Sequence, residues 1–442
     1  MIRSLLIANR GEIAVRIIFA AKELNIRTVL AHSSADTDSL AFRLADETVC
    51  IGPKETKDSY LNIGNIISAA LCSGCDAVHP GVGFLSENGS FASAVIAAGL
   101  IFVGPSPDTI TLLGDKISSR KAAAEADVPV TPGTENKIGS IEDALKNASS
   151  IGYPVILKAS AGGGGRGMRI VKCPEELENA VQISRQEALS FFGNDSLHME
   201  KYLDHPRHVE IQLIGDGEGN AFHLGERDCS IQCRHQKLME ESPSPGITDE
   251  MRQSMGEDAV RLFRHLKYKG AGTVEFLVQD GRYYFMEVNA RVQVEHPVSE
   301  MVNFVDIIKE QLLIASNEKM TITRSLDSIR SHAIECRINA KNAGKITSVY
   351  LPAGAWVRID THIYEGYTVS PFYDPLLAKI IVHTPDRQTS IDVMIRVLSL
   401  LIIEGIETDA DQQLQIISSK EFRSGNFSTA LYDRLFSERG SL

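Results

Sequence analysis

The sequence predicts an α/β and α+β protein of several domains, and three observations support this prediction. The chain has 442 residues, more than one ordinary core holds, so two or three domains are expected. Over residues 4–103, short apolar runs alternate with helical patterns, as in a parallel sheet with crossover helices. A glycine-rich hairpin follows within residues 153–171, and mixed strands and helices are expected from about residue 331 to the end.

The N-terminal segment is predicted to contain a parallel, nucleotide-fold-like sheet. Its apolar runs read SLLIAN, RTVLAHS, ETVCIG, DAVHP and LIFVG, and helices are expected at residues 13–24, near Ile66 and near Phe91. The first run ends in NRGE, residues 9–12, which resembles the turn of a nucleotide-binding fold but lacks G-x-G-x-x-G. Dinucleotide binding is therefore the less favoured interpretation.

A loop of consecutive glycines marks the second segment. A linker rich in Pro, Gly and Ser, residues 129–140, precedes the strand YPVILK, and the loop AGGGGRG, residues 161–167, leads into a second strand, MRIV. A Walker loop would instead run into a helix through Gly-Lys-Ser/Thr, so we interpret this loop as a hairpin lid over phosphates. Its backbone can approach an anion closely, and it can open and close. A merely mobile turn is the less favoured alternative, because the four glycines lie close to Lys158.

Polar and apolar residues alternate strictly from Met286 to Glu295. In an extended chain, this pattern places five polar side chains on one face. A solvated sheet surface would alternate as well, but it would not need this order of acid, amide, arginine, amide and acid. We therefore predict a site formed by Glu287, Asn289, Arg291, Gln293 and Glu295.

The order of these side chains suggests a role for most of them. Two oxygen ligands two residues apart suit magnesium, which also takes phosphate oxygens and water, so Glu287 and Asn289 are the predicted metal ligands. Arg291 offers a planar fork for a carboxylate-like anion such as bicarbonate. Glu295 is spaced to act as a base on the same anion.

A hairpin upstream is predicted to bring a further carboxylate, Glu275, to the metal. If Asp280-Gly281 formed a plain two-residue turn, the residue numbers of each pair of cross-strand partners would add up to an odd number. Glu275 and Glu287, whose numbers add up to an even number, would then face away from each other. We therefore expect a three-residue loop with Gly281 in the left-handed conformation, or an equivalent bulge.

Composition argues against several classes of function. A net charge of −12 argues against nucleic-acid binding, because a phosphate backbone is held by a basic surface. No segment has the pattern of a bilayer span, and polar residues interrupt the apolar N-terminus, so neither a membrane protein nor a signal peptide is expected. The seven cysteines are odd in number and scattered, which indicates reduced thiols and a cytoplasmic location. Cys72-x-x-Cys75 and Cys229-x3-Cys233-x-His235 could bind metal, although buried structural thiols are favoured.

These segments resemble the ATP-grasp carboxylases, and over essentially its full length the chain is similar to the biotin carboxylase subunits of bacterial acetyl-CoA carboxylase. The matching segments are IANRGEIAVRII, HPGVGFLSEN, GDK, KASAGGGGRGMR, MEKYLDHPRHVEIQ, ERDCSIQCRHQK, EVNARVQVEHPVSEM and HAIECRINA. The last three are highly specific to biotin-dependent carboxylases, whereas the glycine loop alone would suggest only an ATP-grasp fold. The resemblance implies an N-terminal domain over residues 1–113, an ATP-grasp domain over 114–330 with its lid at about 131–203, and a C-terminal mixed α+β domain over 331–442.

The resemblance also implies roles for individual residues. ATP would be bound by Lys116 and Lys158 at the phosphates, by Glu200, Lys201 and Leu203 at the adenine, by His208 near the ribose, and by Gly163, Gly164, Gly165, Gln232 and His235. Magnesium or manganese would be held by Glu275, Glu287 and Asn289. Bicarbonate would be held by Lys237, Arg291, Gln293 and Val294, with Glu295 as the general base and Arg337 facing the ureido oxygen of biotin.

The implied reaction runs through carboxyphosphate. Bicarbonate attacks the γ-phosphorus of ATP to give carboxyphosphate, which breaks down to CO2 and phosphate inside a closed site, and biotin is then carboxylated. The sequence has no Met-Lys-Met biotin attachment motif, so biotin is expected on a separate carrier protein, and separate carboxyltransferase subunits would use the product. A cytoplasmic homodimer in fatty acid synthesis is expected, although family dimers use Arg where this chain has Phe19 and Phe where it has Ala355.

Three features depart from the family pattern on the biotin side or its surroundings. Val82 replaces a usual Tyr, Cys233 replaces a usual Arg, and the stretch INAKNAGKI after Arg337 lacks several residues. Two rival interpretations remain. One is another ATP-grasp ligase, which activates a carboxylate for an amine, and the segments RVQVEHP and ECRIN argue against it. The other is a non-catalytic paralogue, which would have no use for Glu295 and Arg337 together.

Overall fold

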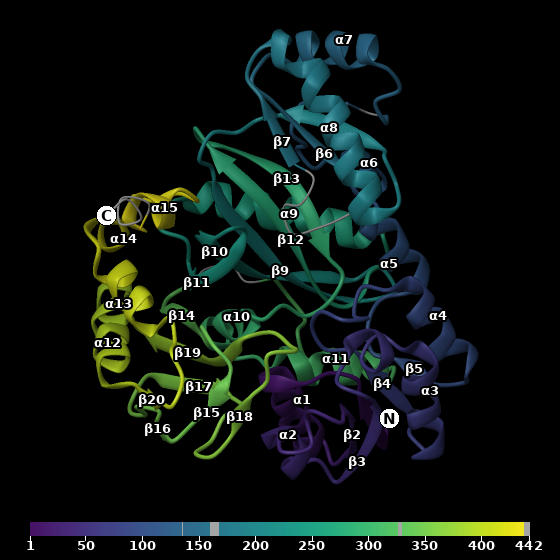
Figure 1. The fold of residues 1–442 in the computed structure, drawn as a ribbon, viewed down its shortest axis with the longest axis vertical. Coiled ribbons are helices and arrows are strands. Elements are labelled where there is room, and N and C mark those ends of the chain that lie inside the picture. Colours follow the sequence, from purple (N-terminus) through teal and green to yellow (C-terminus); the bar gives the residue numbers. More distant parts are fainter. Residues whose placement is uncertain (135, 160–167, 326–328, 437–442) are drawn as a thin grey trace.

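The computed structural model describes residues 1–134, 136–159, 168–325 and 329–436 (Figure 1). The strands form a five-stranded, an eight-stranded and a three-stranded sheet, together with two two-stranded pairs. This architecture confirms the predicted mixture of α/β and α+β structure. Within the described ranges, no helix is both long and apolar enough to cross a membrane.

The N-terminal segment folds into a parallel sheet covered by helices. Its elements are β1 (Ser4–Ile7), α1 (Gly11–Glu23), β2 (Arg27–Ser33), α2 (Leu40–Leu44), β3 (Glu47–Gly52), η1 (Thr56–Asp58), α3 (Ile63–Cys72), β4 (Ala77–His79), α4 (Gly89–Ala97) and β5 (Ile101–Phe102). The strand order is β3-β2-β1-β4-β5. Leu5 and Ile7 pack with α1, whereas Leu6 packs with α3 and α4. Both faces of β1 are therefore buried, which explains its unbroken apolar run.

A small sheet with its own core forms the upper lobe in Figure 1. The lobe and the helices that lead into it comprise α5 (Pro107–Gly114), α6 (Lys116–Glu125), α7 (Ile141–Ile151), β6 (Val155–Ala159), β7 (Met168–Val171), α8 (Pro174–Phe192) and β8 (Leu197–Lys201). Strand β6 pairs antiparallel with β7, so the predicted hairpin is confirmed, whereas its glycine loop lies outside the described residues. The predicted linker makes contacts of its own, because Val130 bridges to Phe285 and Gly133 bridges to Glu200.

The largest sheet is antiparallel and runs through both the central and the C-terminal segments. Its strands are β9 (Arg207–Asp216), β10 (Ala221–Cys233), β11 (Gln236–Ser242), β12 (Lys269–Gln279), β13 (Arg282–Asn289), β14 (His332–Asn339), β17 (Val357–Thr361) and β19 (Leu376–Thr384). The order β13-β12-β9-β10-β11-β14-β19-β17 places β11 of the central segment beside β14 of the C-terminal one.

The two faces of β14 have different surroundings. Ile334, Cys336 and Ile338 pack on α12 (Arg387–Leu400) and α13 (Ala410–Ser418). The alternate residues Glu335 and Arg337 point to the opposite face, on which α10 (His296–Asn303) lies. The segment HAIECRIN is therefore apolar toward one layer of helices and charged toward the other.

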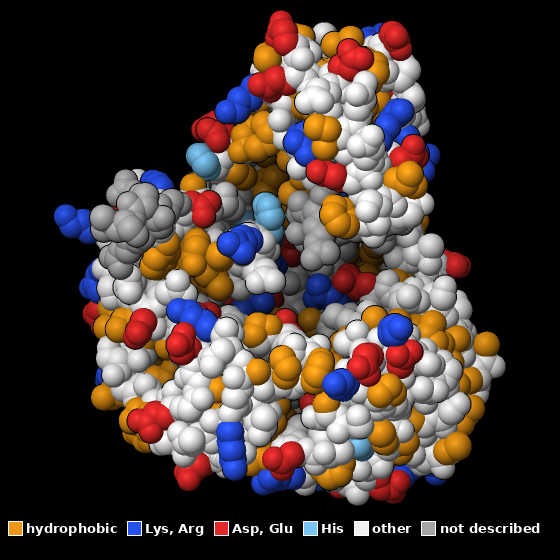
Figure 2. Space-filling model, viewed as in Figure 1, with side chains coloured by type: hydrophobic (Ala, Val, Ile, Leu, Met, Phe, Trp, Pro, Cys, Tyr) orange, Lys and Arg blue, Asp and Glu red, His pale blue; other side chains and the backbone are white. Residues whose placement is uncertain are grey.

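The remaining elements complete the fold. They are α9 (Asp249–His265), α11 (Ile307–Ala315), β15 (Gly344–Lys345), β16 (Ser348–Tyr350), β18 (Thr368–Val369), β20 (Ile402–Glu404), α14 (Lys420–Ser424) and α15 (Leu431–Phe436). Figure 2 shows that the molecule is hollowed between the upper lobe and the lower part, with Lys, Arg and His side chains around the hollow.

Candidate active site

The predicted hairpin is present, and a bulge sets its register. Strands β12 and β13 are joined by a two-residue turn at Asp280 and Gly281, both of which have positive φ. A bulge after Glu275 adds one residue on β13, so Glu275 lies directly opposite Glu287. Of the two predicted alternatives, the structure has the bulge, and the predicted common face for the two carboxylates is confirmed.

The prediction of one extended strand through Glu295 is wrong beyond Asn289. Strand β13 ends there, because the next amide, that of Ala290, donates to Glu87 Oε1 at 3.0 Å instead of to β12. Residues 290–295 form an irregular loop that leads into α10. The loop folds over the sheet rather than away from it, and Glu295 is only 1% exposed.

The ammonium group of Lys237 lies among three carboxylates. Its Nζ is 2.6 Å from Glu210 Oε2, 2.8 Å from Glu275 Oε1 and 2.7 Å from Glu295 Oε1. It also donates to Gln293 Oε1 at 3.1 Å. Burial favours the neutral amine, but the three carboxylates outweigh burial and raise the pKa of Lys237. Lys237 therefore remains charged and links β9, β11 and β12 to the 290–295 loop.

Glu295 lies between two cations. One carboxylate oxygen accepts from Lys237, and the other accepts from Arg337 Nη2 at 2.9 Å. Burial favours the neutral acid, but these cations hold the pKa of Glu295 below its ordinary value. Arg337 is held in turn by Glu240, to which its Nε donates at 2.7 Å. The arrangement presents a charged carboxylate, flanked by two cations that an anionic ligand could share.

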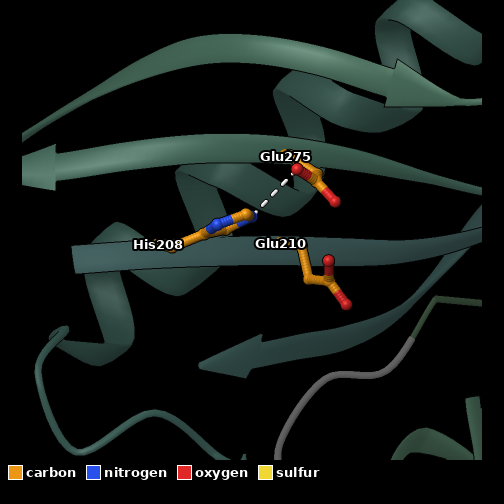
Figure 3. Close-up of side chains that lie close together, drawn as sticks. All are labelled: His208, Glu210 and Glu275. Carbon is orange, nitrogen blue, oxygen red and sulfur yellow. Dashed lines mark ion pairs between the residues drawn. The ribbon is translucent and has the colours of Figure 1, made fainter. Parts of the chain in front are cut away.

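His208 connects the candidate metal ligands to the candidate nucleotide residues. Its Nε2 is 2.9 Å from Glu275, and its Nδ1 is 2.7 Å from Gln232 Nε2. Burial lowers the pKa of His208, but the carboxylate of Glu275 outweighs burial and raises it overall. Figure 3 shows His208 and Glu210 projecting from β9, and Glu275 from the neighbouring β12. Ligand atoms of these three residues lie within 4.8 Å of one another.

Two nucleotide candidates from the upper lobe contact each other. Lys158 on β6 and Glu200 on β8 form an ion pair of 2.6 Å, and this contact helps to keep the pKa of Glu200 low despite its burial. The side chain of Lys201 points elsewhere, because its Nζ donates to the carbonyls of Gly152 and Tyr153 at 3.0 and 2.9 Å. The Lys201 amide donates to the carbonyl of Pro132 at 2.8 Å, so the backbone of Lys201 is held as well.

The remaining nucleotide candidates are more scattered. Lys116 is the first residue of α6, Leu203 follows β8, and His235 is exposed in the turn between β10 and β11. Gly163, Gly164 and Gly165 lie outside the described residues.

Three family models match the chain, one after another. Residues 1–110 match "Biotin carboxylase, N-terminal domain", residues 115–323 match "Carbamoyl-phosphate synthase L chain, ATP binding domain", and residues 335–434 match "Biotin carboxylase C-terminal domain". The biotin carboxylase of Allochromatium vinosum is 51% identical over 436 residues, which cover 96% of each chain. Biotin carboxylase 1 of Bacillus subtilis is 49% identical, over 97% of this chain and 98% of the relative. The chain belongs to the biotin carboxylase family.

Solved biotin carboxylases have the same fold. The Campylobacter jejuni biotin carboxylase, solved as a β,γ-ATP complex, superposes with a TM-score of 0.94 at 42% identity, covering 98% of this chain and 99% of that one. The biotin carboxylase domain dimer of Hydrogenobacter thermophilus 2-oxoglutarate carboxylase, solved with MgADP and bicarbonate, has a TM-score of 0.93 at 41% identity over 98% of both chains. Membership of the biotin carboxylase family makes this chain an enzyme that carboxylates biotin in an ATP-dependent reaction.

The metal-ligand candidates of this biotin carboxylase family member suit a hard divalent cation. Glu275 and Glu287 face each other, and Asn289 donates to Glu275 at 2.8 Å from the same hairpin. Burial and the charge of Glu275 raise the pKa of Glu287, while Lys116 acts in the opposite direction. A buried carboxylate and a half-buried one side by side repel each other, and a divalent cation held by oxygen ligands would relieve that repulsion.

The side chain of Arg291 is held by Glu87, a residue to which the sequence analysis gave no role. Its Nε donates to Glu87 Oε2 at 2.9 Å, and its Nη2 donates to Asn289 Oδ1 at 3.1 Å. Glu87 lies within HPGVGFLSEN, a segment that carried the biotin carboxylase resemblance, so position within a matching motif was the available signal. Glu210 could have been found from β9, where polar His208, Glu210 and Gln212 alternate with apolar residues.

The three departures from the biotin carboxylase pattern lie in different surroundings. Val82 is half-buried against the apolar cluster that includes α1. Burial and the nearby thiol of Cys233 raise the pKa of Tyr432 to about 12. The shortened loop after β14 is closed by a bridge between Ala340 and Thr408.

Proposed function

We propose that this enzyme carboxylates biotin attached to a separate carrier protein, as the first half-reaction of acetyl-CoA carboxylase in fatty acid synthesis. The observation that carries the proposal is Glu295, held as a carboxylate between Lys237 and Arg337. The assignment to acetyl-CoA carboxylase is supported by the high identity to biotin carboxylases over nearly their whole lengths. Related folds also occur in 2-oxoglutarate and pyruvate carboxylases, so the final acceptor needs its own test.

Bicarbonate would lie among Lys237, Arg291, Gln293 and Val294, with Glu295 as its base. A base with a lowered pKa accepts protons poorly. Bicarbonate that accepts a hydrogen bond from Lys237 would weaken the contact of 2.7 Å between Lys237 and Glu295. The pKa of Glu295 would then rise while bicarbonate is bound, which is when a base is needed. The bicarbonate O–H proton then moves to Glu295, and the resulting oxyanion attacks the γ-phosphorus of ATP. The bond to ADP breaks, and carboxyphosphate forms.

The nucleotide would lie between the upper lobe and the large sheet. Lys116, Lys158 and the glycine loop would neutralise the phosphates, and Glu200, Lys201, Leu203, His208, Gln232 and His235 would surround the adenosine. Glu275, Glu287 and Asn289 would hold magnesium or manganese, whose charge would stabilise the transferred phosphoryl group. The contacts of His208 with Gln232 and Glu275 support a nucleotide site continuous with the metal site.

Biotin would meet the site at Arg337. Carboxyphosphate breaks into CO2 and phosphate, phosphate accepts the N1′ proton of biotin, and N1′ bonds to CO2. Arg337 would stabilise the negative charge that develops on the ureido oxygen. Because Arg337 is only 2.9 Å from Glu295, the two reaction centres would be adjacent. The carrier delivers biotin, and carboxyltransferase subunits take the product.

We also infer a cytoplasmic homodimer with domains over residues 1–113, 114–330 and 331–442. A related biotin carboxylase domain was solved as a dimer. Large aromatic side chains are exposed on this chain, with Phe304 83% and Trp356 53% exposed. Phe304 stacks edge-on against His383, whose amide donates to the Trp356 carbonyl, so the two aromatics share one surface. Sedimentation velocity tests the inference, and a monomer at all concentrations would refute it.

ATP hydrolysis that depends on bicarbonate and on biotin tests the reaction. The unaltered protein should release phosphate only when bicarbonate is present, and should carboxylate a biotinylated carrier protein. Addition of carboxyltransferase with acetyl-CoA, pyruvate or 2-oxoglutarate then identifies the acceptor. Hydrolysis that depends on an amine would favour another ATP-grasp ligase, and no hydrolysis under any condition would favour a non-catalytic paralogue.

A further inference from the structure

A fully buried lysine lies beneath the 290–295 loop. Lys379 is 0% exposed and sits on β19. It lies directly opposite Arg337 of β14 on one side and Asp360 of β17 on the other. Directly opposite residues of antiparallel strands share a face, so Lys379 and Arg337 point to the same side of the sheet. That side carries α10 and the loop before it.

Lys379 contacts the loop through its backbone. Its Nζ donates to the carbonyl of Val294 at 2.8 Å, lies 3.0 Å from Glu12 Oε2, and lies 3.9 Å from Asp360 Oδ2. Burial favours the neutral amine, but Glu12, Glu335 and Asp360 outweigh burial and raise the pKa of Lys379. A charged donor therefore holds the carbonyl that joins Val294, a candidate bicarbonate ligand, to Glu295, the candidate base.

The orientation of that carbonyl determines the orientation of an amide. The peptide bond between Val294 and Glu295 is trans, since the described cis bonds precede only Pro154 and Pro243. In a trans peptide, the C=O and the next N–H point in opposite directions. The Glu295 N–H therefore points away from Lys379. Within the described chain, neither this amide nor that of Val294 has a hydrogen-bond acceptor.

We propose that Lys379 and Glu12 are positioning residues, which fix the Val294–Glu295 peptide so that its amide can donate to bicarbonate. The inference rests on the proposed function, because it deepens the assignment of the bicarbonate site. Neither side chain touches the anion. Lys379 orients the peptide, and Glu12 orients Lys379 and balances its charge.

The proposal also gives a use to the NRGE segment at the end of β1. Gly11 has a φ of +67°, a conformation that favours glycine, and it lets the chain turn sharply into α1. Arg10 is tied to Asp36 by two hydrogen bonds of 2.9 and 2.8 Å. Glu12, the second residue of α1, is thereby directed toward β19. The N-terminal segment thus contributes Glu12, in addition to Glu87, to the surroundings of the 290–295 loop.

Replacement of Lys379 tests the proposal. Lys379→Met keeps an unbranched side chain of nearly the same length but removes the donor, and the KM for bicarbonate should rise on the order of tenfold while the KM for ATP changes less than about twofold. Lys379→Arg restores a charged donor and should recover part of the loss. Arg387→Met is the matched control, because it breaks a buried pair with Glu241 on the other face of the sheet, and it should leave the KM for bicarbonate unchanged.

A second readout does not depend on turnover. In hydrogen exchange measured by mass spectrometry, bicarbonate should slow exchange in peptides that span residues 290–295 of the unaltered protein, but not of Lys379→Met. If Lys379→Met does not fold, the double variant Glu12→Gln, Lys379→Met removes both charges and serves in its place. A folded variant with an unaltered KM for bicarbonate and unaltered protection would overturn the proposal. Protection in an unaltered protein that lacks bicarbonate-dependent hydrolysis would instead refute only the proposed function.

Discussion

Glu275 and Glu287 lie directly opposite each other in the β12–β13 pair, because a single bulge reverses the register set by the turn. Without the extra residue, the two carboxylates would lie on opposite faces of the sheet. The bulge therefore creates a pair of like charges that repel each other unless a cation is present.

Removal of one member of this pair should weaken the metal site. We expect Glu287→Gln to raise the magnesium concentration for half-maximal ATP hydrolysis by about 10–100-fold, or about 1.4–2.8 kcal/mol. Titration of magnesium at a fixed ATP concentration measures this constant. Glu257→Gln, on the exposed surface of α9, is the control and should leave it unaltered. An unchanged magnesium dependence in Glu287→Gln would remove Glu287 from the metal site.

Glu295→Gln should retain ATP binding but lose turnover. The amide keeps the shape of the side chain but cannot accept the bicarbonate proton, so bicarbonate-dependent turnover should fall by a factor on the order of 10²–10⁴. Phosphate release measures turnover, and calorimetric titration with a non-hydrolysable ATP analogue checks nucleotide binding. Near-normal turnover would show that another group is the base.

Glu240 should make the stability of the protein depend on pH. Burial and the charge of Glu295 raise its pKa to about 7 from an ordinary 4.5, in spite of Arg337. Between these two values the folded state binds the proton and the unfolded state does not, so this group's contribution to stability falls as pH rises through that window. Glu240→Gln cannot ionise and should lack this fall.

The measurement compares thermal unfolding of Glu240→Gln and the unaltered protein from about pH 4 to about pH 8. The variant should gain relative stability with rising pH, by about 3 kcal/mol over the window, with little further change above it. Because both proteins contain the other buried carboxylates, the contribution of those groups to the pH dependence cancels in the comparison. A difference that does not vary with pH would show that folding does not raise the pKa of Glu240.

Val82 should make free biotin a poor substrate. An aromatic ring at this position could cover one face of the bicyclic ligand, and Val offers less apolar contact, a loss of about 1 kcal/mol. Val82→Tyr should therefore lower the KM for free biotin about fivefold. The biotinylated carrier, which also binds through protein surface, should be carboxylated efficiently by both proteins. If free-biotin kinetics do not change while the carrier is carboxylated, position 82 lies outside the pocket.

The sequence predicted local structure well where one pattern determined it. Alternating apolar runs and helical patterns identified the N-terminal sheet. The requirement that Glu275 and Glu287 lie on one face of the hairpin predicted an odd loop or a bulge, and the bulge is present. The prediction of an extended strand from alternating side chains failed beyond Asn289. Strict alternation continues to Glu295, but an extended strand also needs a hydrogen-bonded neighbour, and Ala290 instead donates to Glu87, about two hundred positions away along the sequence.

The residues that the sequence did not reveal act through partners distant along the chain. Glu240 had no motif of its own, yet it holds Arg337 at 2.7 Å. Lys379 looks like an isolated charge in an apolar strand, and only the fold brings it to Glu12. A single sequence carries no signal for such pairs, because their partners become neighbours only after the sheets have packed.

The chain cannot be cut near residue 330 without opening a sheet. Residues 239–242 of β11 pair with residues 333–336 of β14, so a fragment that ended between these strands would expose a row of unpaired amides and carbonyls. Such an open edge is a template for aggregation. Lys237 and Arg337, which lie on the two sides of this seam, are spaced by backbone hydrogen bonds and not by a hinge. A chimaera that took its C-terminal region from another carboxylase would therefore work only if it reproduced this strand register to the residue.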